Sequence, residues 1–316
     1  MKIGILFPGY GSQYIGMAKD LYDDSRIVQE YFEEASNCLD INFVKLCFAS
    51  SDTELSRIDN AYTAIFLVSS ALYALLKDSG VTPYRIAGYN QGEFSAIHAA
   101  GGFTFPDGLY LLSKYATLYG QLLSTSDVNG IRISALPFEQ LNTVCQKMSK
   151  PDRWIQIAIQ NLPKEHIIMG HPAAIELVRE HVMELAEVEI YDAEVELGLH
   201  APCMEPIVAA LKTYSQKVDF KDLSIPLVTN ADAALVTQGV DVKAAVMKQV
   251  ESVVRWSDCM TAFAECDLLL EVGPGSALTA LAKKLYPDKL CKSINTKDDF
   301  NELHRLLKPI EPQQET

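Results

Sequence analysis

Basic side chains are scarce in this 316-residue sequence, where 27 Lys and Arg face 41 Asp and Glu and the formal net charge is −14. A surface with this excess of negative charge repels phosphate groups. We therefore expect neither nucleic acid nor an anionic membrane surface as a partner. A phosphate-bearing ligand would need a local basic group such as Lys283 and Lys284, which could equally form the solvated face of a helix.

Long apolar runs are also missing, since none reaches the ~18 to 20 residues that span a bilayer. The N-terminus has one Lys and a short apolar run without a small-residue cleavage signature, so residues 3–7 predict a buried strand rather than a signal peptide. A hydrophobic content of 48% and a charged content of 22% are typical of a globular protein with an ample core. We expect a cytoplasmic protein.

Paired cysteines are a third absence. The seven cysteines are odd in number, scattered and without a C-x-x-C pair. This pattern indicates a reducing compartment and argues against a zinc site or a disulfide framework. We expect no metal, no cofactor and a core-packing role for these side chains.

Strand-like runs alternate with helix-length amphipathic segments, which predicts an α/β protein with a largely parallel sheet. The predicted strands of this sheet are residues 3–7, 85–87, 226–230 and 268–272. The predicted helices are residues 60–78, 107–123, 202–216, 242–253 and 276–285, and Thr104 or Asp107 is the expected N-cap of the second one.

The middle third of the chain has a different pattern. Residues 130–136, 154–160, 166–170 and 188–195 predict strands, and residues 138–148 and 172–185 predict helices. This βαββαβ order is that of a ferredoxin-like unit. We therefore expect a core of residues 1–125 and 197–308, an inserted subdomain of residues 126–196 and a flexible tail of residues 309–316.

The strongest local signal is a strand-turn-helix elbow at residues 87–93, which read A-G-Y-N-Q-G-E. Gly88 and Gly92 flank the central residue by two positions, which keeps Cβ atoms out of a crowded corner and lets one side chain project alone. In active enzymes that central residue is Ser, whereas here it is Asn90. A carboxamide nitrogen is delocalised into its carbonyl and has no lone pair free to attack a thioester.

These motifs resemble those of the malonyl-CoA:acyl carrier protein transacylase family, which includes the acyltransferases of polyketide synthases. Residues 7–13 (F-P-G-Y-G-S-Q) resemble its F-P-G-Q-G-S-Q opening, residues 88–93 its G-H-S-x-G-E elbow, and residues 271–275 its E-V-G-P-G segment. Asn161 begins the match to N-S-P, Leu199 and His200 match the catalytic histidine, and residues 252–256 match a segment whose backbone carbonyl orients that histidine. The resemblance covers residues 1 to about 295 and implies an α/β-hydrolase-like core with a ferredoxin-like subdomain.

The resemblance also implies chemistry. In this family a Ser activated by His takes the malonyl group from coenzyme A and transfers it to the phosphopantetheine thiol of a carrier protein. The backbone N–H groups of the oxyanion hole would belong to Tyr10 and Gln91. His200 would be oriented through Arg255, and Asn161 and Leu199 would line the acyl pocket.

Five departures from the family pattern fall within this site. Ser is replaced by Asn90, and the other family residues (the elbow His, the opening Gln, the pocket Gln and the malonate-binding Arg) are replaced by Tyr89, Tyr10, Tyr62 and Tyr115. Without the Arg, malonate loses its bidentate partner. The tyrosines are expected to fill the pocket, through selection for an aromatic site or through drift after activity was lost.

Two readings of the function remain open, besides ordinary transacylase activity. One is a catalytically inactive or impaired homologue in fatty-acid or polyketide synthesis that binds an acyl group, acyl-CoA, pantetheine, an acyl carrier protein or a synthase. The other is an active acyltransferase or thioester hydrolase in which His200 activates a water against a non-malonyl substrate. Cys203, at the expected start of a helix, is either an alternative nucleophile with a lowered pKa or a buried core residue.

Overall fold

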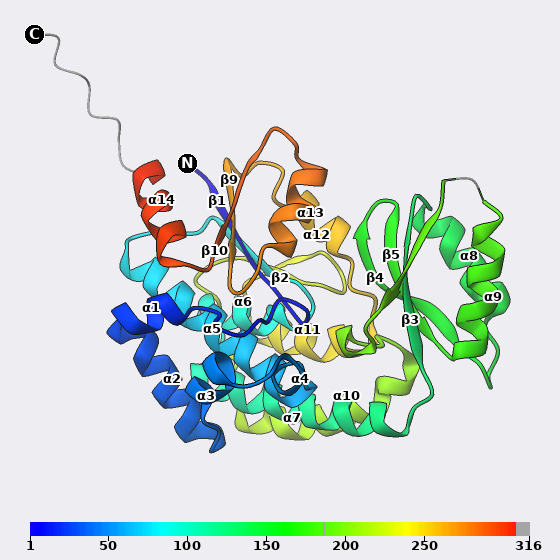
Figure 1. Cartoon of the computed structure of the whole chain (residues 1–316), viewed down its shortest axis with the longest axis horizontal. Helices are drawn as coiled ribbons and strands as arrows, with labels where there is room; N and C mark the ends of the chain where they lie inside the picture. Colours follow the sequence, from blue (N-terminus) through cyan, green and yellow to red (C-terminus); the bar gives the residue numbers. More distant parts are fainter. Residues whose placement is uncertain (186, 308–316) are drawn as a thin grey trace, which may run out of the picture.

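A six-stranded sheet forms the centre of the larger part of the molecule, in a computed structural model that describes residues 1–185 and 187–307 (Figure 1). The strand order is β10-β9-β1-β2-β7-β8, and every neighbouring pair is parallel except β7 and β8. Ile5 of β1 lies opposite Ile86 of β2 and Leu270 of β9. The strands are β1 (Ile3–Phe7), β2 (Arg85–Gly88), β7 (Leu227–Val228), β8 (Leu235–Val236), β9 (Leu268–Val272) and β10 (Leu290–Ile294). The predicted α/β class with a parallel-rich sheet is confirmed.

Helices surround this sheet and share one apolar core with it. They are α1 (Lys19–Asp24), α2 (Arg26–Leu39), α3 (Phe43–Ala49), α4 (Asp52–Leu55), α5 (Ile58–Asp78), α6 (Gly92–Ala99), α7 (Phe105–Thr125), α10 (Glu205–Tyr214), α11 (Gly239–Glu251), α12 (Trp256–Thr261), α13 (Ala277–Leu285) and α14 (Lys297–Leu307). The hydroxyl of Thr104 accepts a hydrogen bond from the Asp107 amide at 3.3 Å, so Thr104 is the N-cap of α7.

Helix α5 lies at the middle of the helical layer, against α2, α6 and α7. Its length and composition alone would suit a membrane span, but 78% of its most apolar window is buried inside the protein. An apolar helix that is buried on nearly all sides is typical of the core of a large domain.

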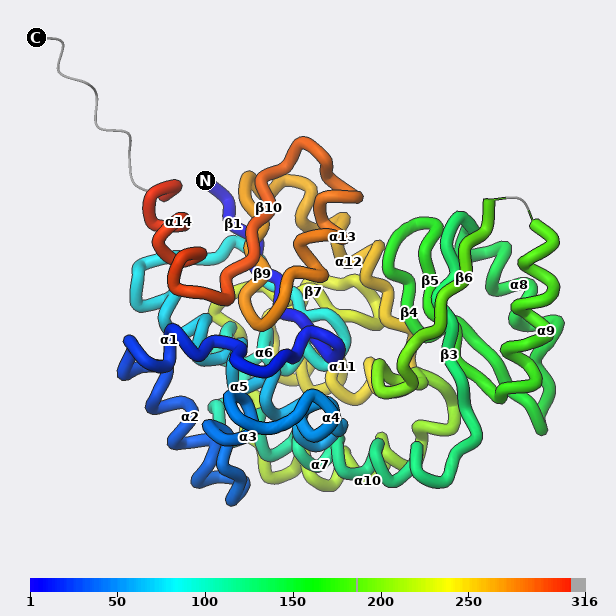
Figure 2. The backbone as a smooth tube through the Cα atoms, in the orientation of Figure 1, coloured from blue at the N-terminus to red at the C-terminus, as the bar shows by residue number. Residues whose placement is uncertain are grey.

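A second, four-stranded sheet lies to one side of the molecule (Figure 2). Its strands are antiparallel in the order β4-β5-β3-β6, and its elements follow the chain as β3 (Asn129–Ser134), α8 (Phe138–Met148), β4 (Ile155–Leu162), β5 (Glu165–Gly170), α9 (Pro172–Met183) and β6 (Glu189–Ala193). This is the βαββαβ order predicted from the sequence. The side chains between this sheet and its two helices form a separate apolar cluster, which includes Ile131, Leu141 and Val178.

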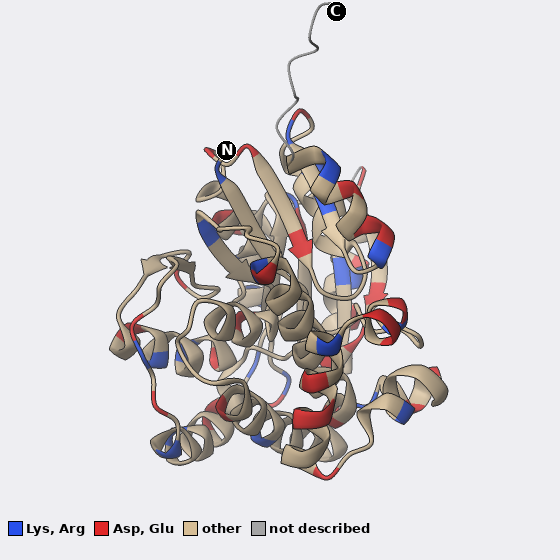
Figure 3. Cartoon of the chain, turned by 90° about the vertical axis from the view of Figure 1, so that its left-hand side faces the viewer, with Lys and Arg blue, Asp and Glu red and all other residues tan. Residues whose placement is uncertain are grey.

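The sequence did not indicate α1 to α4, α12, α14 or the edge strands β8 and β10. The expected tail of residues 309–316 lies outside the described residues. Acidic and basic residues are interspersed over the face that Figure 3 presents.

Candidate active site

The elbow predicted around Asn90 is present between β2 and α6. Asn90 has a φ of 54°, a left-handed conformation that a non-glycine residue rarely adopts. A Cβ at Gly88 would lie 2.0 Å from the backbone C of Gly92, and one at Gly92 would lie 2.4 Å from the carbonyl O of Phe7. Only glycine fits at either position, so the turn keeps the tight geometry of a nucleophile elbow.

The Asn90 side chain is bound to the main chain of a distant segment. Its Nδ2 donates a hydrogen bond to the carbonyl of Leu197, and the residue is 1% exposed. Its backbone N–H donates to Oδ1 of Asn230 at 3.3 Å. The group at the nucleophile position is therefore a buried hydrogen-bond donor.

Gln91 occupies the region predicted for the oxyanion hole. Its Oε1 accepts a hydrogen bond from the Tyr10 amide at 3.3 Å. Its Nε2 donates to the hydroxyl of Tyr62 and, at 3.3 Å, to the carbonyl of Leu197. One of the two predicted oxyanion donors, the Tyr10 N–H, thus already has an acceptor within the chain.

Two tyrosines also bind this distant segment. The hydroxyl of Tyr62 donates to the carbonyl of Glu196 at 2.8 Å, and the hydroxyl of Tyr119 donates to the carbonyl of Val195. Burial raises the pKa of both hydroxyls, so they remain protonated donors at neutral pH. Tyr119 was missed in the sequence, although it lies one helical turn beyond Tyr115 on α7.

The short 3₁₀ helix Val195–Leu197, here called the 195–197 segment, therefore presents three consecutive carbonyls to the site. Their hydrogen-bond donors are Asn90, Gln91, Tyr62 and Tyr119. The segment links β6 to the core, so these bonds hold the junction between the two sheets against the elbow.

Tyr115 lies in the same aromatic cluster without a bond to that segment. Its ring centroid is 5.8 Å from that of Tyr62 and 6.1 Å from that of Tyr119. Its buried hydroxyl has no hydrogen-bond partner among the described residues. Tyr115, which we predicted to stand where the resembled family has its malonate-binding Arg, is therefore a buried neutral ring.

His200 lies close by, also with a left-handed backbone (φ of 49°) and 1% exposed. Its Nδ1 is 2.9 Å from the carbonyl O of Gln249, and because a carbonyl only accepts, Nδ1 carries the proton and Nε2 the lone pair. A Cβ on Gly198 would lie 2.6 Å from Nε2, so glycine is needed there. Burial lowers the pKa of His200 to about 4, which keeps the ring neutral at pH 7.

The predicted orientation of His200 through Arg255 is wrong. The carbonyl that fixes Nδ1 belongs to Gln249 at the end of α11, whereas the Arg255 side chain pairs with Asp258 at 2.6 Å. A backbone carbonyl can come from any residue type, so the sequence offered no side chain by which to identify it.

A buried polar network connects the elbow with His200. Asn230 Nδ2 donates to the Asn90 carbonyl at 3.3 Å, to Gln249 Oε1 at 3.0 Å and to Oε2 of Glu93. The Asn230 amide donates to the same carboxyl oxygen at 2.7 Å. Burial raises the pKa of Glu93 to about 7. The sequence did not identify Glu93, Asn230 or Gln249 as members of this network, although Glu93 lies within the elbow motif.

The remaining predicted site residues form no hydrogen bond with the 195–197 segment. They are Tyr89, Asn161, Leu199 and Cys203. The Tyr89 hydroxyl donates to Asn161 Oδ1 at 2.7 Å, and Asn161 Nδ2 donates to Glu165 Oε1 at 3.4 Å, which joins the elbow to the smaller sheet. Leu199 is fully buried. Burial raises the pKa of Cys203, opposite to the lowering that an alternative nucleophile would need.

Comparisons with known proteins agree with this architecture. Residues 5–299 match the family model described as "Acyl transferase domain". The malonyl CoA-acyl carrier protein transacylase of Bacillus subtilis (strain 168) is 32% identical over 286 residues, which are 90% of each chain. The crystal structure of an acyl carrier protein S-malonyltransferase from Vibrio cholerae superimposes with a TM-score of 0.89 at 26% identity and covers 96% of this chain and 100% of that one.

A further solved structure shares the fold. It is described as a type II polyketide synthase acyl-carrier protein in complex with its malonyl-transacylase. Its TM-score is 0.89 at 24% identity, and the match covers 95% of this chain and 98% of that chain.

Proposed function

This chain belongs to the malonyl-CoA:acyl carrier protein transacylase family, and we propose that it acts with an acyl carrier protein in fatty-acid or polyketide synthesis without forming an acyl-enzyme. Its role is that of a pseudoenzyme: it binds a carrier protein, a synthase or an acyl-pantetheine group in the cytoplasm. Relatives named for transfer to acyl carrier protein support the choice of partner.

The observation that carries the proposal is the Asn90 carboxamide, which is bound to the carbonyl of Leu197 at the centre of an intact elbow. The group has no nucleophilic lone pair, and its hydrogen bond directs it to the main chain. Loss of the nucleophile in enzymes of this type lowers the rate by about 10⁴ to 10⁶. The elbow geometry is a property of Gly88 and Gly92 and persists without the reaction.

The oxyanion and malonate positions support the same conclusion. An acyl oxygen would have to displace Gln91 Oε1 from the Tyr10 amide. The family's malonate-binding Arg is replaced by Tyr115, whose buried ring offers no charge to a carboxylate. Restoring the serine alone would therefore leave two further requirements of the reaction unmet.

The deciding experiment compares the chain with Asn90→Ser and Asn90→Ala variants in radiolabelled malonyl-CoA and acetyl-CoA transfer to a carrier protein. We expect no transfer and no covalent adduct by intact mass spectrometry for the native chain, together with measurable binding of the phosphopantetheinylated carrier protein. A covalent acyl adduct on any residue of the native chain would refute the proposal. Asn90→Ala is the matched control, because it removes the carboxamide without supplying a hydroxyl.

A thioester hydrolase is the second candidate, and one observation favours it. Nε2 of His200 carries a lone pair and has no partner in the described part of the chain, as a general base for water requires. Its pKa of about 4 and its burial make it a weak, enclosed base at neutral pH. Thiol release from acyl-CoA that disappears in a His200→Ala variant would support this candidate, and release equal to that without protein would exclude it.

A further inference from the structure

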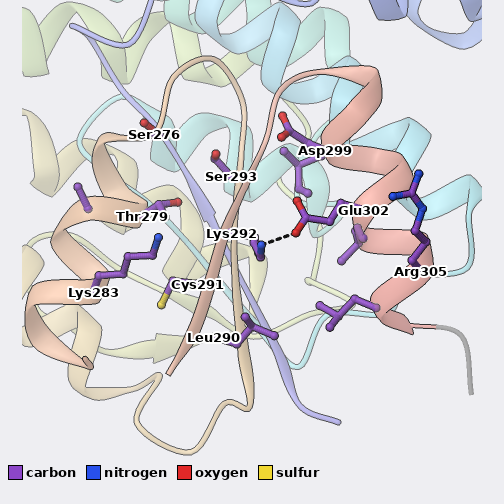
Figure 4. Close-up of a pocket in the computed structure, with 14 residues that line it drawn as sticks. Ser276, Thr279, Lys283, Leu290, Cys291, Lys292, Ser293, Asp299, Glu302 and Arg305 are labelled. Atoms are coloured by element: carbon purple, nitrogen blue, oxygen red, sulfur yellow. Dashed lines mark hydrogen bonds and ion pairs between the residues drawn. The ribbon is translucent and has the colours of Figure 1, made fainter. Parts of the chain in front are cut away.

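A groove of about 720 Å³ follows the outer edge of β10, between α13 and α14 (Figure 4). None of the residues of the candidate active site lines it. β10 is the end strand of the larger sheet and pairs with β9 on one side, so within the described chain no strand occupies its other edge. The main-chain N–H and C=O groups on such an edge are available to a further strand.

The groove has apolar side chains at one end. Leu290 of β10 and Leu306 of α14 are 36% and 43% exposed, although both are large and apolar. Ala280 of α13 is also exposed and lines the groove, which Leu303 of α14 lines from a buried position. Neighbouring apolar side chains left exposed beside a free strand edge are typical of a surface that another chain covers.

Some charged side chains of the groove have partners within the chain, and others have none among the described residues. Lys292 pairs with Glu302 at 2.6 Å, and Asp299 accepts hydrogen bonds from the amides of Asn295 and Thr296 at 3.1 and 2.9 Å. Lys283 on α13 and Arg305 on α14 are exposed and form no ion pair with any described residue. Two unpaired cations on opposite walls of one groove give it a positive character, in a chain whose net charge is −14.

We propose that this groove binds an extended, acidic segment of a partner protein, which adds a strand to β10 and places carboxylates near Lys283 and Arg305. Strand addition supplies affinity through main-chain hydrogen bonds and selectivity through alternate side chains. At ~3.3 Å per residue the five residues of β10 span about 16 Å, so the bound segment has about five residues. A second copy of this chain fits less well, because each copy would bring the same unpaired cations, Lys283 and Arg305, to the shared edge.

The test is fluorescence anisotropy of a labelled seven-residue peptide of alternating Glu and Val with the full chain. We expect binding that weakens at least ~10-fold in a Lys283→Glu/Arg305→Glu variant. A Lys45→Glu/Lys147→Glu variant changes two exposed lysines far from the groove by the same charge and should bind as the native chain does. Circular dichroism confirms that both variants fold.

Backbone-modified peptides separate strand addition from charge attraction. Peptides N-methylated at alternate residues, one for each register, should show at least one register whose binding is lost. The proposal is overturned if both N-methylated peptides bind as tightly as the unmodified peptide, if the Lys283→Glu/Arg305→Glu variant binds with unchanged affinity, or if the acidic peptide does not bind. Binding that appears only after removal of residues 308–316 assigns the groove to the chain's own terminus and also overturns it. The outcome is independent of acyl transfer, so it does not bear on the proposed function.

Discussion

The hydroxyls of Tyr62, Tyr119 and Tyr115 should contribute to stability with opposite signs, although the three rings form one buried cluster. Tyr62 and Tyr119 donate to carbonyls of the 195–197 segment, and the Tyr62 hydroxyl also accepts from Gln91. Tyr→Phe removes these bonds. The Glu196 carbonyl then loses its tyrosine donor, whereas the Val195 carbonyl keeps the Gly198 amide at 3.2 Å. Because a lost hydrogen bond of this kind costs about 1 to 2 kcal/mol, each variant should be destabilised by that amount.

Tyr115→Phe is the matched control within the same cluster. Its hydroxyl is buried and lacks a partner among the described residues, so its removal relieves a desolvation cost rather than breaking a bond. We expect this variant to be neutral or more stable by about 1 kcal/mol.

Urea unfolding followed by circular dichroism measures the difference. A loss of about 1.5 kcal/mol, with an m value of about 3 kcal/mol/M, lowers the midpoint by ~0.5 M. If Tyr115→Phe lowers the midpoint as much as Tyr119→Phe does, the hydrogen bonds to the 195–197 segment are not what stabilises the closed site, and the reasoning fails.

Three further predictions follow from the elbow and its network. Gly88→Ala should destabilise the protein by several kcal/mol and lower its thermal midpoint, because the new Cβ would lie 2.0 Å from the Gly92 backbone. Gly120→Ala is the control: its Cβ would have no atom within 4 Å, so the thermal midpoint should not fall. Glu93 has a folded-state pKa of about 7, raised from 4.5, so its contribution to stability is fully present below pH 4.5 and is lost as pH rises through 7. Between pH 5 and 8 the unfolding free energy from urea titrations should fall by about 2.5 kcal/mol more in the native chain than in Glu93→Gln, and an equal pH dependence would exclude this. His200, whose pKa is lowered to about 4, should show no NMR titration of its ring between pH 8 and 5.5, and a midpoint near 6.5 would mean that the ring is solvated.

The elbow was the part of the site that the sequence predicted best. Only glycine fits at positions 88 and 92, because a Cβ there would clash with the backbone. Such a strict requirement leaves a glycine spacing that can be recognised in the sequence. The apolar runs of β1 and β9 and the long helices α5 and α7 were recognised for the same reason, since their burial is nearly continuous.

The contacts that close the site could not be predicted in this way. The 195–197 segment acts through carbonyls, which every residue type carries, so nothing in Val195 or Glu196 indicates its three acceptors. The Gln249 carbonyl beside His200 is a second case, and it explains the wrong assignment to Arg255. The short helices α1, α3 and α4 were missed because six, seven and four residues are too few to establish a helical period.

The pattern of replacements bears on why the site is closed. Neutral drift after loss of the nucleophile would leave side chains without a common partner. Instead Asn90 and Tyr62, two of the positions that depart from the family pattern, donate to adjacent carbonyls of one segment, and Gln91 and Tyr119 extend the same set. These hydrogen bonds tie the junction between the two sheets to the elbow. Under the proposed function, this shared partner favours selection for a fixed junction over drift. Tyr115, whose hydroxyl has no partner among the described residues, gives no such support.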